Sequence, residues 1–147
     1  MNDKSLRSVV EAKQAVIFDL FHTLTSLGNT GEARPRTADI LGVPWDLWYK
    51  QLVDTAADRF AGKIQDPLEI TRKLALAIDP AIPEARIREA TAYRIERFRG
   101  AVVGVPEVTE RTLVALRAMG KKIGLISNAD VAEAAGWDES PIATLFD

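Results

Sequence analysis

The sequence predicts an α/β fold in which a parallel sheet is interrupted by a helical insertion. Two short apolar segments end in polar residues, 15–18 before Asp19 and 123–126 before Ser127, and each is typical of a buried strand. Between them, residues from about 36 to 99 have the periodicity of helices. Because a strand, a crossover and a second strand usually set the two strands parallel, we expect both polar ends at one edge of the sheet.

The insertion is predicted to contain three helices. The first starts after Pro44 and stops at Gly62, the second has Asp66 as its N-cap and is broken by Pro80, and the third runs from 83 or 84 to 98. Three consecutive helices are unusual for a simple βαβ unit, so we interpret them as a cap rather than part of one layer. The positions expected to face the core are Trp45, Trp48, Tyr49, Leu52, Ala56 and Phe60 in the first helix, Leu68, Leu74, Ala75 and Ile78 in the second, and Ile87, Ala90 or Thr91, and Ile95 in the third.

The segments on either side of the insertion are assigned to the sheet. Residues 6–14 are expected to form a short helix or an arm that leads into the first strand. A further helix is predicted from Pro106 to Gly120, with Leu113, Leu116 and Met119 on its apolar face. The predicted domains are therefore an incomplete α/β core, 1–26 and 101–147, and a helical cap, 27–100.

Composition limits the function classes. The chain has 147 residues, 47% of them hydrophobic and 27% charged, with a net charge of −2 and no cysteine. Disulfides and thiolate metal sites are excluded, and without a basic excess or a long apolar segment we expect neither nucleic-acid nor membrane partners. A cytoplasmic location, a small-molecule substrate and self-association through an exposed sheet edge are the expectations that remain.

The first strand and the residues after it resemble the first motif of the haloacid dehalogenase-like (HAD) hydrolases. Asp19, Thr23 and Leu24 match that motif, whereas Phe21 and His22 stand where phosphatases of the family usually carry Asp and Gly. The resemblance implies that Asp19 is the catalytic nucleophile and that Thr23 helps to bind substrate. The alternative is that an apolar strand ending in Asp is only structural.

The second strand resembles the second motif of the same family, in the segment Ile126-Ser127-Asn128-Ala129-Asp130. The resemblance implies that the Ser127 hydroxyl, with Asn128 beside it, binds a non-bridging oxygen of the group being transferred. The alternative is that residues 127–130 cap a following helix, and both interpretations can hold together. The two motifs predict a truncated HAD-like (Rossmannoid) parallel-sheet core with an inserted helical cap.

Phe21 leaves the reaction open between two types. An aromatic ring cannot protonate a leaving alkoxide, but halide needs no proton, so Asp19 is compatible with carbon–halogen hydrolysis without a metal. It is also compatible with hydrolysis of a phosphate that has a good leaving group, in which Asp19 and the backbone carbonyl of Phe21 would contribute to a Mg²⁺ site. His22 is a candidate proton donor, or a residue that only packs or caps in the loop.

Two features of the family are missing from the chain. The family continues after the second motif with a Lys or Arg and later with an acidic motif, but no Lys or Arg follows Lys122 and the sequence stops at Asp147. We therefore expect an incomplete, inactive fragment of a hydrolase for small phosphorylated or halogenated substrates. A non-catalytic HAD-fold binding or regulatory module is the alternative, and an unrelated α/β domain is the third.

Overall fold

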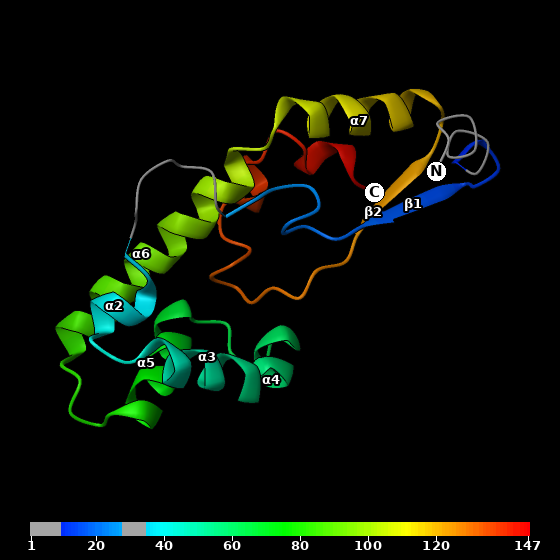
Figure 1. Ribbon diagram of the computed structural model, residues 1–147. Coiled ribbons are helices and arrows are strands. Elements are labelled where there is room, and N and C mark those ends of the chain that lie inside the picture. The colour runs from blue at the N-terminus through cyan, green and yellow to red at the C-terminus, as the bar shows by residue number, and fades with distance from the viewer. Residues whose placement is uncertain (1–9, 28–34) are drawn as a thin grey trace. The chain divides into compact units, whose positions relative to one another are not determined.

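The computed structural model describes residues 10–27 and 35–147 (Figure 1). Within these ranges the chain is mixed α/β, with a two-stranded parallel sheet and six α-helices. The described residues group into a sheet unit, 10–27, 101–127 and 136–147, and a helical unit, 35–100 and 128–135. Residues 6–9 of the predicted N-terminal segment lie outside the described ranges.

The sheet consists of β1 (Ala15–Phe18) and β2 (Lys122–Leu125), which pair in parallel as the sequence predicts. Ala15 is opposite Lys122 and Phe18 is opposite Leu125. The strand β2 begins and ends one residue earlier than expected, although the N–H of Ile126 still donates to the Phe18 carbonyl at 2.9 Å. Two strands form a smaller sheet than the several-stranded core that the resemblance implies.

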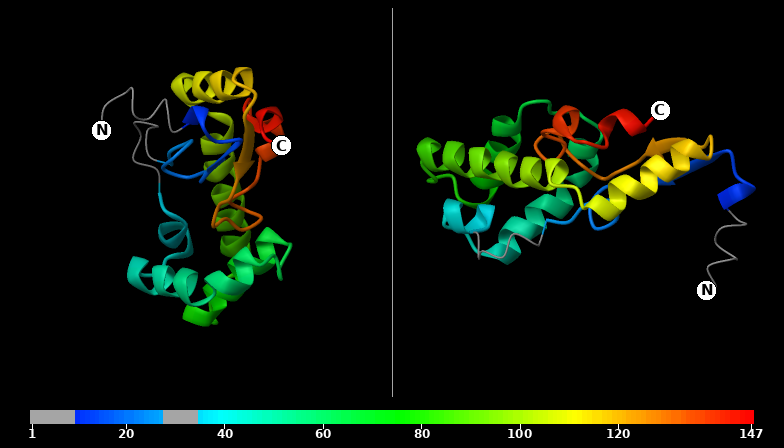
Figure 2. Two further views of the ribbon diagram at one scale, coloured as in Figure 1. Left: turned by 90° about the vertical axis from the view of Figure 1, so that its right-hand side faces the viewer. Right: turned by 90° about the horizontal axis from the view of Figure 1, so that it is seen from above.

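One face of this sheet packs against α7 (Glu107–Ala118), as Figures 1 and 2 show. The helix α7 follows Pro106 and ends before Gly120, whose φ of 72° lies in the left-handed region favoured by glycine. Met119, predicted to face the core, is 43% exposed because it is the C-cap residue, where the helical periodicity no longer applies. The buried members of this core are Leu20, Leu24, Val102, Leu113, Leu116, Ile123 and Ile142.

The helix α6 (Glu84–Val103) extends five residues beyond its predicted end at 98 and includes Gly100. The last carbonyls of a helix have no intrahelical partner, and two of them are bonded here by side chains of the sheet unit. The Thr25 hydroxyl donates to the Ala101 carbonyl, and the Ser140 hydroxyl donates to the Val102 carbonyl at 2.7 Å. Near the end of the chain are two short 3₁₀-helices, Trp137–Glu139 and Ala143–Leu145. The N–H of Asp147 donates to the Ile123 carbonyl, and the N–H of Ile123 donates to the Asp147 carboxylate.

The helical unit contains α2 (Thr37–Leu41), α3 (Trp45–Asp54), α4 (Ala56–Phe60), α5 (Pro67–Ile78) and most of α6. The N-terminus of α5 is as predicted, since the Asp66 carboxylate accepts the N–H of Leu68 at 2.9 Å. The buried core of this unit is formed by Ala38, Leu41, Trp48, Ile70, Leu74, Ala75, Ile82, Ile87 and Ala90.

The prediction of one helix from Pro44 to Gly62 is wrong. The helix is interrupted at Thr55, which separates α3 from α4 and whose hydroxyl donates to the Gln51 carbonyl at 2.8 Å. Phe60 is consequently 38% exposed, whereas Arg59 is buried. Of the other aromatic residues assigned to the core of this segment, Trp48 is buried, and Trp45 and Tyr49 are exposed.

No helix within the described ranges is both long enough and apolar enough to cross a membrane.

Candidate active site

Asp19 is the first residue after β1 and begins a tight loop. Leu20 and Leu24 are buried in the core of the sheet unit, and the Leu20 carbonyl accepts the N–H groups of Leu24 and Thr25 at 2.9 and 3.1 Å. Because these leucines anchor the loop from inside, Asp19 and Thr23 are left exposed. The Thr23 hydroxyl donates to the Asp19 carboxylate at 3.3 Å, so the loop brings two predicted site residues together.

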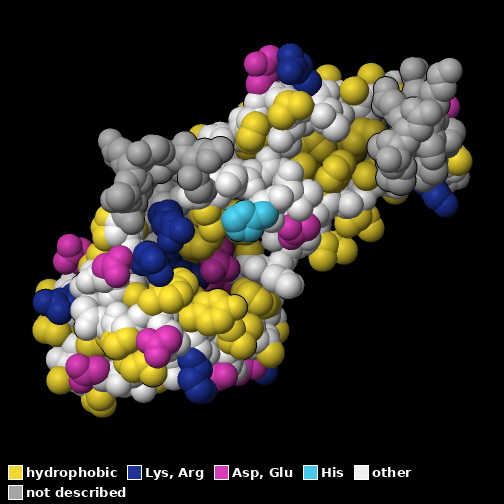
Figure 3. Space-filling model, viewed as in Figure 1, with side chains coloured by type: hydrophobic (Ala, Val, Ile, Leu, Met, Phe, Trp, Pro, Cys, Tyr) yellow, Lys and Arg dark blue, Asp and Glu magenta, His cyan; other side chains and the backbone are white. Residues whose placement is uncertain are grey.

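His22 lies in the same loop in a left-handed conformation with a φ of 62°. Its N–H donates to the Thr25 carbonyl at 2.6 Å, which closes the turn. A non-glycine residue is uncommon at such a φ, and His22 occupies the position at which family phosphatases usually carry Gly. Figure 3 shows this side chain, the single histidine of the chain, on the surface. Its role as a proton donor stays a prediction.

Ser127 follows β2 at the same edge of the sheet as Asp19 follows β1. The register places Phe18 opposite Leu125, and the hydrogen bond from Ile126 to Phe18 continues the pairing to the end of both strands. Asp19 is therefore the residue directly after β1, whereas Ile126 separates Ser127 from the end of β2, and Ser127 is half-buried. The carboxyl edge is where open α/β sheets place ligands.

Asn128 begins the segment 128–135, which groups with the helical unit rather than with the sheet. The α-helix that residues 127–130 were expected to cap is absent from this described segment, which forms a single turn. Asp130 caps that turn, because its carboxylate accepts the N–H groups of Ala132 and Glu133 at 3.0 and 3.2 Å. Its own N–H donates to the Glu133 carboxylate at 3.0 Å.

Asp130 is also the centre of a buried ion-pair cluster that the sequence did not indicate. It pairs with Arg59 at 2.5 Å and with Arg94 at 2.9 Å, and the three side chains are 0%, 4% and 4% exposed. Arg94 additionally pairs with Glu133 at 2.6 Å. Burial alone would raise the pKa of Asp130, but the charges and hydrogen bonds of Arg94 and Arg59 outweigh it and lower that pKa.

No group of three His, Cys, Asp or Glu residues within 10–27 and 35–147 is arranged to hold a metal. Magnesium is usually bound through one or two carboxylates together with water and substrate oxygens. Asp19 and the Phe21 carbonyl are the two predicted donors, and their role in binding Mg²⁺ stays a prediction.

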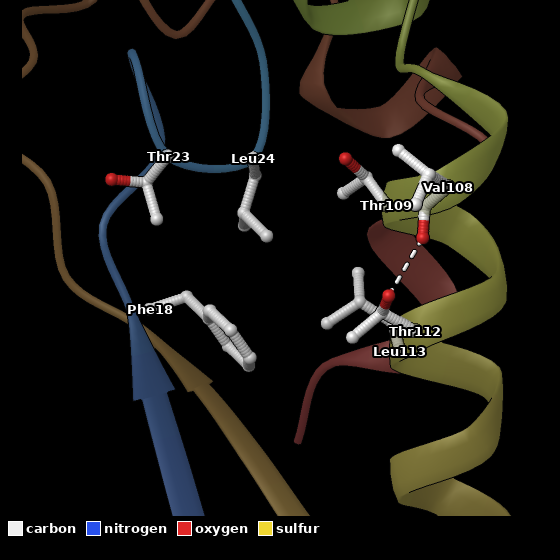
Figure 4. Close-up of a pocket in the computed structure, with 7 residues that line it drawn as sticks. All are labelled: Phe18, Thr23, Leu24, Val108, Thr109, Thr112 and Leu113. Atoms are coloured by element: carbon white, nitrogen blue, oxygen red, sulfur yellow. Dashed lines mark hydrogen bonds between the residues drawn. The ribbon is translucent and has the colours of Figure 1, made fainter. Parts of the chain in front are cut away.

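A small pocket lies beside the Asp19 loop (Figure 4). It has a volume of about 140 Å³, and it opens between the end of β1 and the first turns of α7. Thr23, the hydrogen-bond partner of Asp19, is part of its wall. The Thr112 hydroxyl is already bonded to the Val108 carbonyl at 2.7 Å, so it is not a free donor toward the pocket. The lining residues are Phe18, Thr23, Leu24, Val108, Thr109, Thr112 and Leu113.

Comparison of the chain with family models, curated proteins and solved structures found no match. The interpretation of this site therefore depends on the two motifs and on the geometry of the loops that carry them.

Proposed function

We propose that this chain carries the nucleophile of a HAD-like hydrolase that acts on a small phosphorylated or halogenated substrate. The observation that supports the proposal most strongly is the position of Asp19 and Ser127 beyond the ends of two paired parallel strands, Asp19 directly after β1 and Ser127 one residue after Ile126. The hydrogen bond from Thr23 to Asp19 adds to it, because it orients the carboxylate within the loop. An exposed carboxylate held in this way is accessible to a substrate.

In the proposed reaction, a carboxylate oxygen of Asp19 attacks the substrate. With a halogenated substrate, a carbon–oxygen bond forms as the carbon–halogen bond breaks, and halide leaves. Water then attacks the ester carbonyl, releases the alcohol and regenerates the carboxylate. With a phosphorylated substrate that has a good leaving group, an oxygen–phosphorus bond forms as the bond to the leaving oxygen breaks, and the leaving group departs as its anion. Water then attacks the aspartyl phosphate, which releases phosphate and regenerates the carboxylate. The Ser127 hydroxyl would donate to a substrate oxygen, and the pocket beside Thr23 would hold a small apolar part.

Phe21 favours a second candidate, a non-catalytic binding or regulatory module. Phe21 has no acidic group for proton transfer to a leaving group. Loss of one preorganised electrostatic group typically lowers the rate by about 10²–10³. We therefore propose that the 147-residue chain by itself is inactive or nearly so.

The test measures turnover of p-nitrophenyl phosphate with Mg²⁺ and of 2-chloropropionate without it. The 147-residue chain is compared with Asp19→Asn and with Asp138→Asn, an exposed acid of the same unit that serves as the control for charge. We expect the chain to match Asp19→Asn, and we expect the product of the gene's complete reading frame to show turnover that Asp19→Asn abolishes. Turnover by that product without any dependence on Asp19 would overturn the proposal. A reading frame that stops at 147 would favour the non-catalytic module.

A further inference from the structure

The segment after Ser127 is attached to the helical unit through the Asp130 cluster. We propose that Asp130 is a positioning residue that, together with Arg59 and Arg94, determines the conformation of Ser127 and Asn128. The ligand that Ser127 and Asn128 bind is inferred from the proposed function. The positioning itself follows from the contacts of Asp130 within the helical unit and from the three-residue distance along the chain between Ser127 and Asp130.

Both oxygens of the Asp130 carboxylate are occupied. One accepts Nη1 of Arg59 at 2.5 Å and Nη2 of Arg94 at 2.9 Å. The other accepts Nη1 of Arg94 at 3.2 Å and the backbone N–H groups of Ala132 and Glu133. One side chain therefore joins α4, α6 and the backbone of the turn that follows Ser127.

The two arginines are themselves held by the helical unit. Arg59 donates to the Leu52 carbonyl at 2.6 Å and to the Thr55 hydroxyl at 3.1 Å, so its guanidinium group is fixed by the interruption between α3 and α4. The Arg94 guanidinium carbon lies 5.5 Å from the ring centre of Phe98, which is on the same helix. The two positive charges are balanced by Asp130 and Glu133. The cluster is thus a pre-arranged receptor for one carboxylate and not a site for a further ion.

A buried ion pair is weak evidence for a contribution to stability, because apolar residues of similar volume often replace one without loss. The alternative to positioning is that apolar contacts hold the segment. Ala132 is fully buried, and Val131 packs against the core of the helical unit. The two explanations can be separated by replacing the charged side chains with apolar ones. If the polar cluster positions the turn, its backbone loses hydrogen bonds; if apolar contacts hold it, its backbone stays protected.

The experiment uses amide hydrogen exchange and NMR chemical shifts in two variants. One is Asp130→Asn, and the other combines Arg59→Met, Arg94→Met and Asp130→Leu, which keeps the interior filled and removes every charge of the cluster except that of Glu133 at its edge. Glu84→Gln, which breaks an exposed ion pair with Arg72 in the same unit, is the control.

In both cluster variants we expect exchange at Ala132 and Glu133 to be at least about tenfold faster, because both variants remove the charged carboxylate that accepts these two N–H groups. In the combined variant, exchange across Ile70–Ala75 should change by less than about threefold, which shows that the helical core is intact. The signals of Ser127 and Asn128 should shift in both. Glu84→Gln should reproduce none of these effects.

Unchanged protection at Ala132 and Glu133 in the combined variant would overturn the proposal in favour of apolar packing. Faster exchange with unmoved Ser127 and Asn128 signals would overturn the positioning role. A titration with inorganic phosphate separates this inference from the function. If the unmodified chain binds no phosphate, the proposed action on phosphorylated substrates fails, whereas the exchange data still decide the role of Asp130.

Discussion

Replacement of Thr25 by valine should destabilise the sheet unit through a single hydroxyl group. Thr25 is buried, and its hydroxyl donates to the Ala101 carbonyl in the last turn of α6. Valine has nearly the same shape but no donor, so the variant leaves a buried carbonyl without its partner. Such a loss costs about 1–3 kcal/mol, which corresponds to an opening constant about 5 to 150 times larger.

Amide exchange of Ile126 is the measurement, because this N–H bonds to the Phe18 carbonyl and is released when the sheet opens. Thr112→Val is the matched control. The Thr112 hydroxyl also donates to a carbonyl, that of Val108, but it is exposed, so water can replace it and the expected cost is below about 0.5 kcal/mol. If Thr25→Val accelerates exchange no more than Thr112→Val does, then the hydroxyl does not hold the end of α6 and the reasoning is refuted.

Three further predictions concern other parts of the chain. In urea unfolding, His22→Gly should be at least as stable as the parent chain. His22→Val should be less stable by about 1 kcal/mol or more, because a left-handed φ is unfavourable for a branched side chain. Equal urea midpoints of the two variants would contradict this prediction. Arg94 and Arg59 lower the pKa of Asp130, so the contribution of the ionised Asp130 to stability is complete above about pH 5 and is lost as the pH falls through the lowered folded-state pKa. The difference in unfolding free energy between the parent chain and Asp130→Asn should therefore shrink below about pH 4. A difference that stays constant with pH would contradict this prediction. Ile17 of β1 is 64% exposed, so sedimentation should show self-association that Ile17→Lys reduces, and a monomer in both cases would exclude this surface of β1 as a contact.

The strands, α5 and α7 could be predicted because each depends on local chemistry. A short apolar run ending in a polar residue predicts a strand, and Asp66 and Gly120 predict a helix start and a helix end by capping. Parallel pairing followed from the length of the connection between the strands. Because the strands pair in parallel, Asp19 and Ser127 could be placed at the same edge of the sheet.

The features that could not be predicted depend on contacts distant in sequence. Arg59 and Arg94 lie 71 and 36 residues before Asp130, and a charged side chain within a helical pattern is normally assigned to the surface. The interruption at Thr55 was a second obstacle, because no proline or glycine marks that position in the sequence. That interruption places Arg59, instead of Phe60, in the interior.

The most direct test of the central claim, that the Asp19 carboxylate faces the bound group of a substrate, is an NMR titration of the chain with inorganic phosphate. We expect chemical-shift changes confined to the loop 20–24 and to Ser127. We also expect Asp19→Asn to bind phosphate about fivefold more tightly, because removal of one like charge about 4 Å away in water is worth about 1 kcal/mol. Asp138→Asn should leave the affinity unchanged. Shifts located elsewhere, or equal affinities of the chain and Asp19→Asn, would contradict the assignment of Asp19 as the nucleophile.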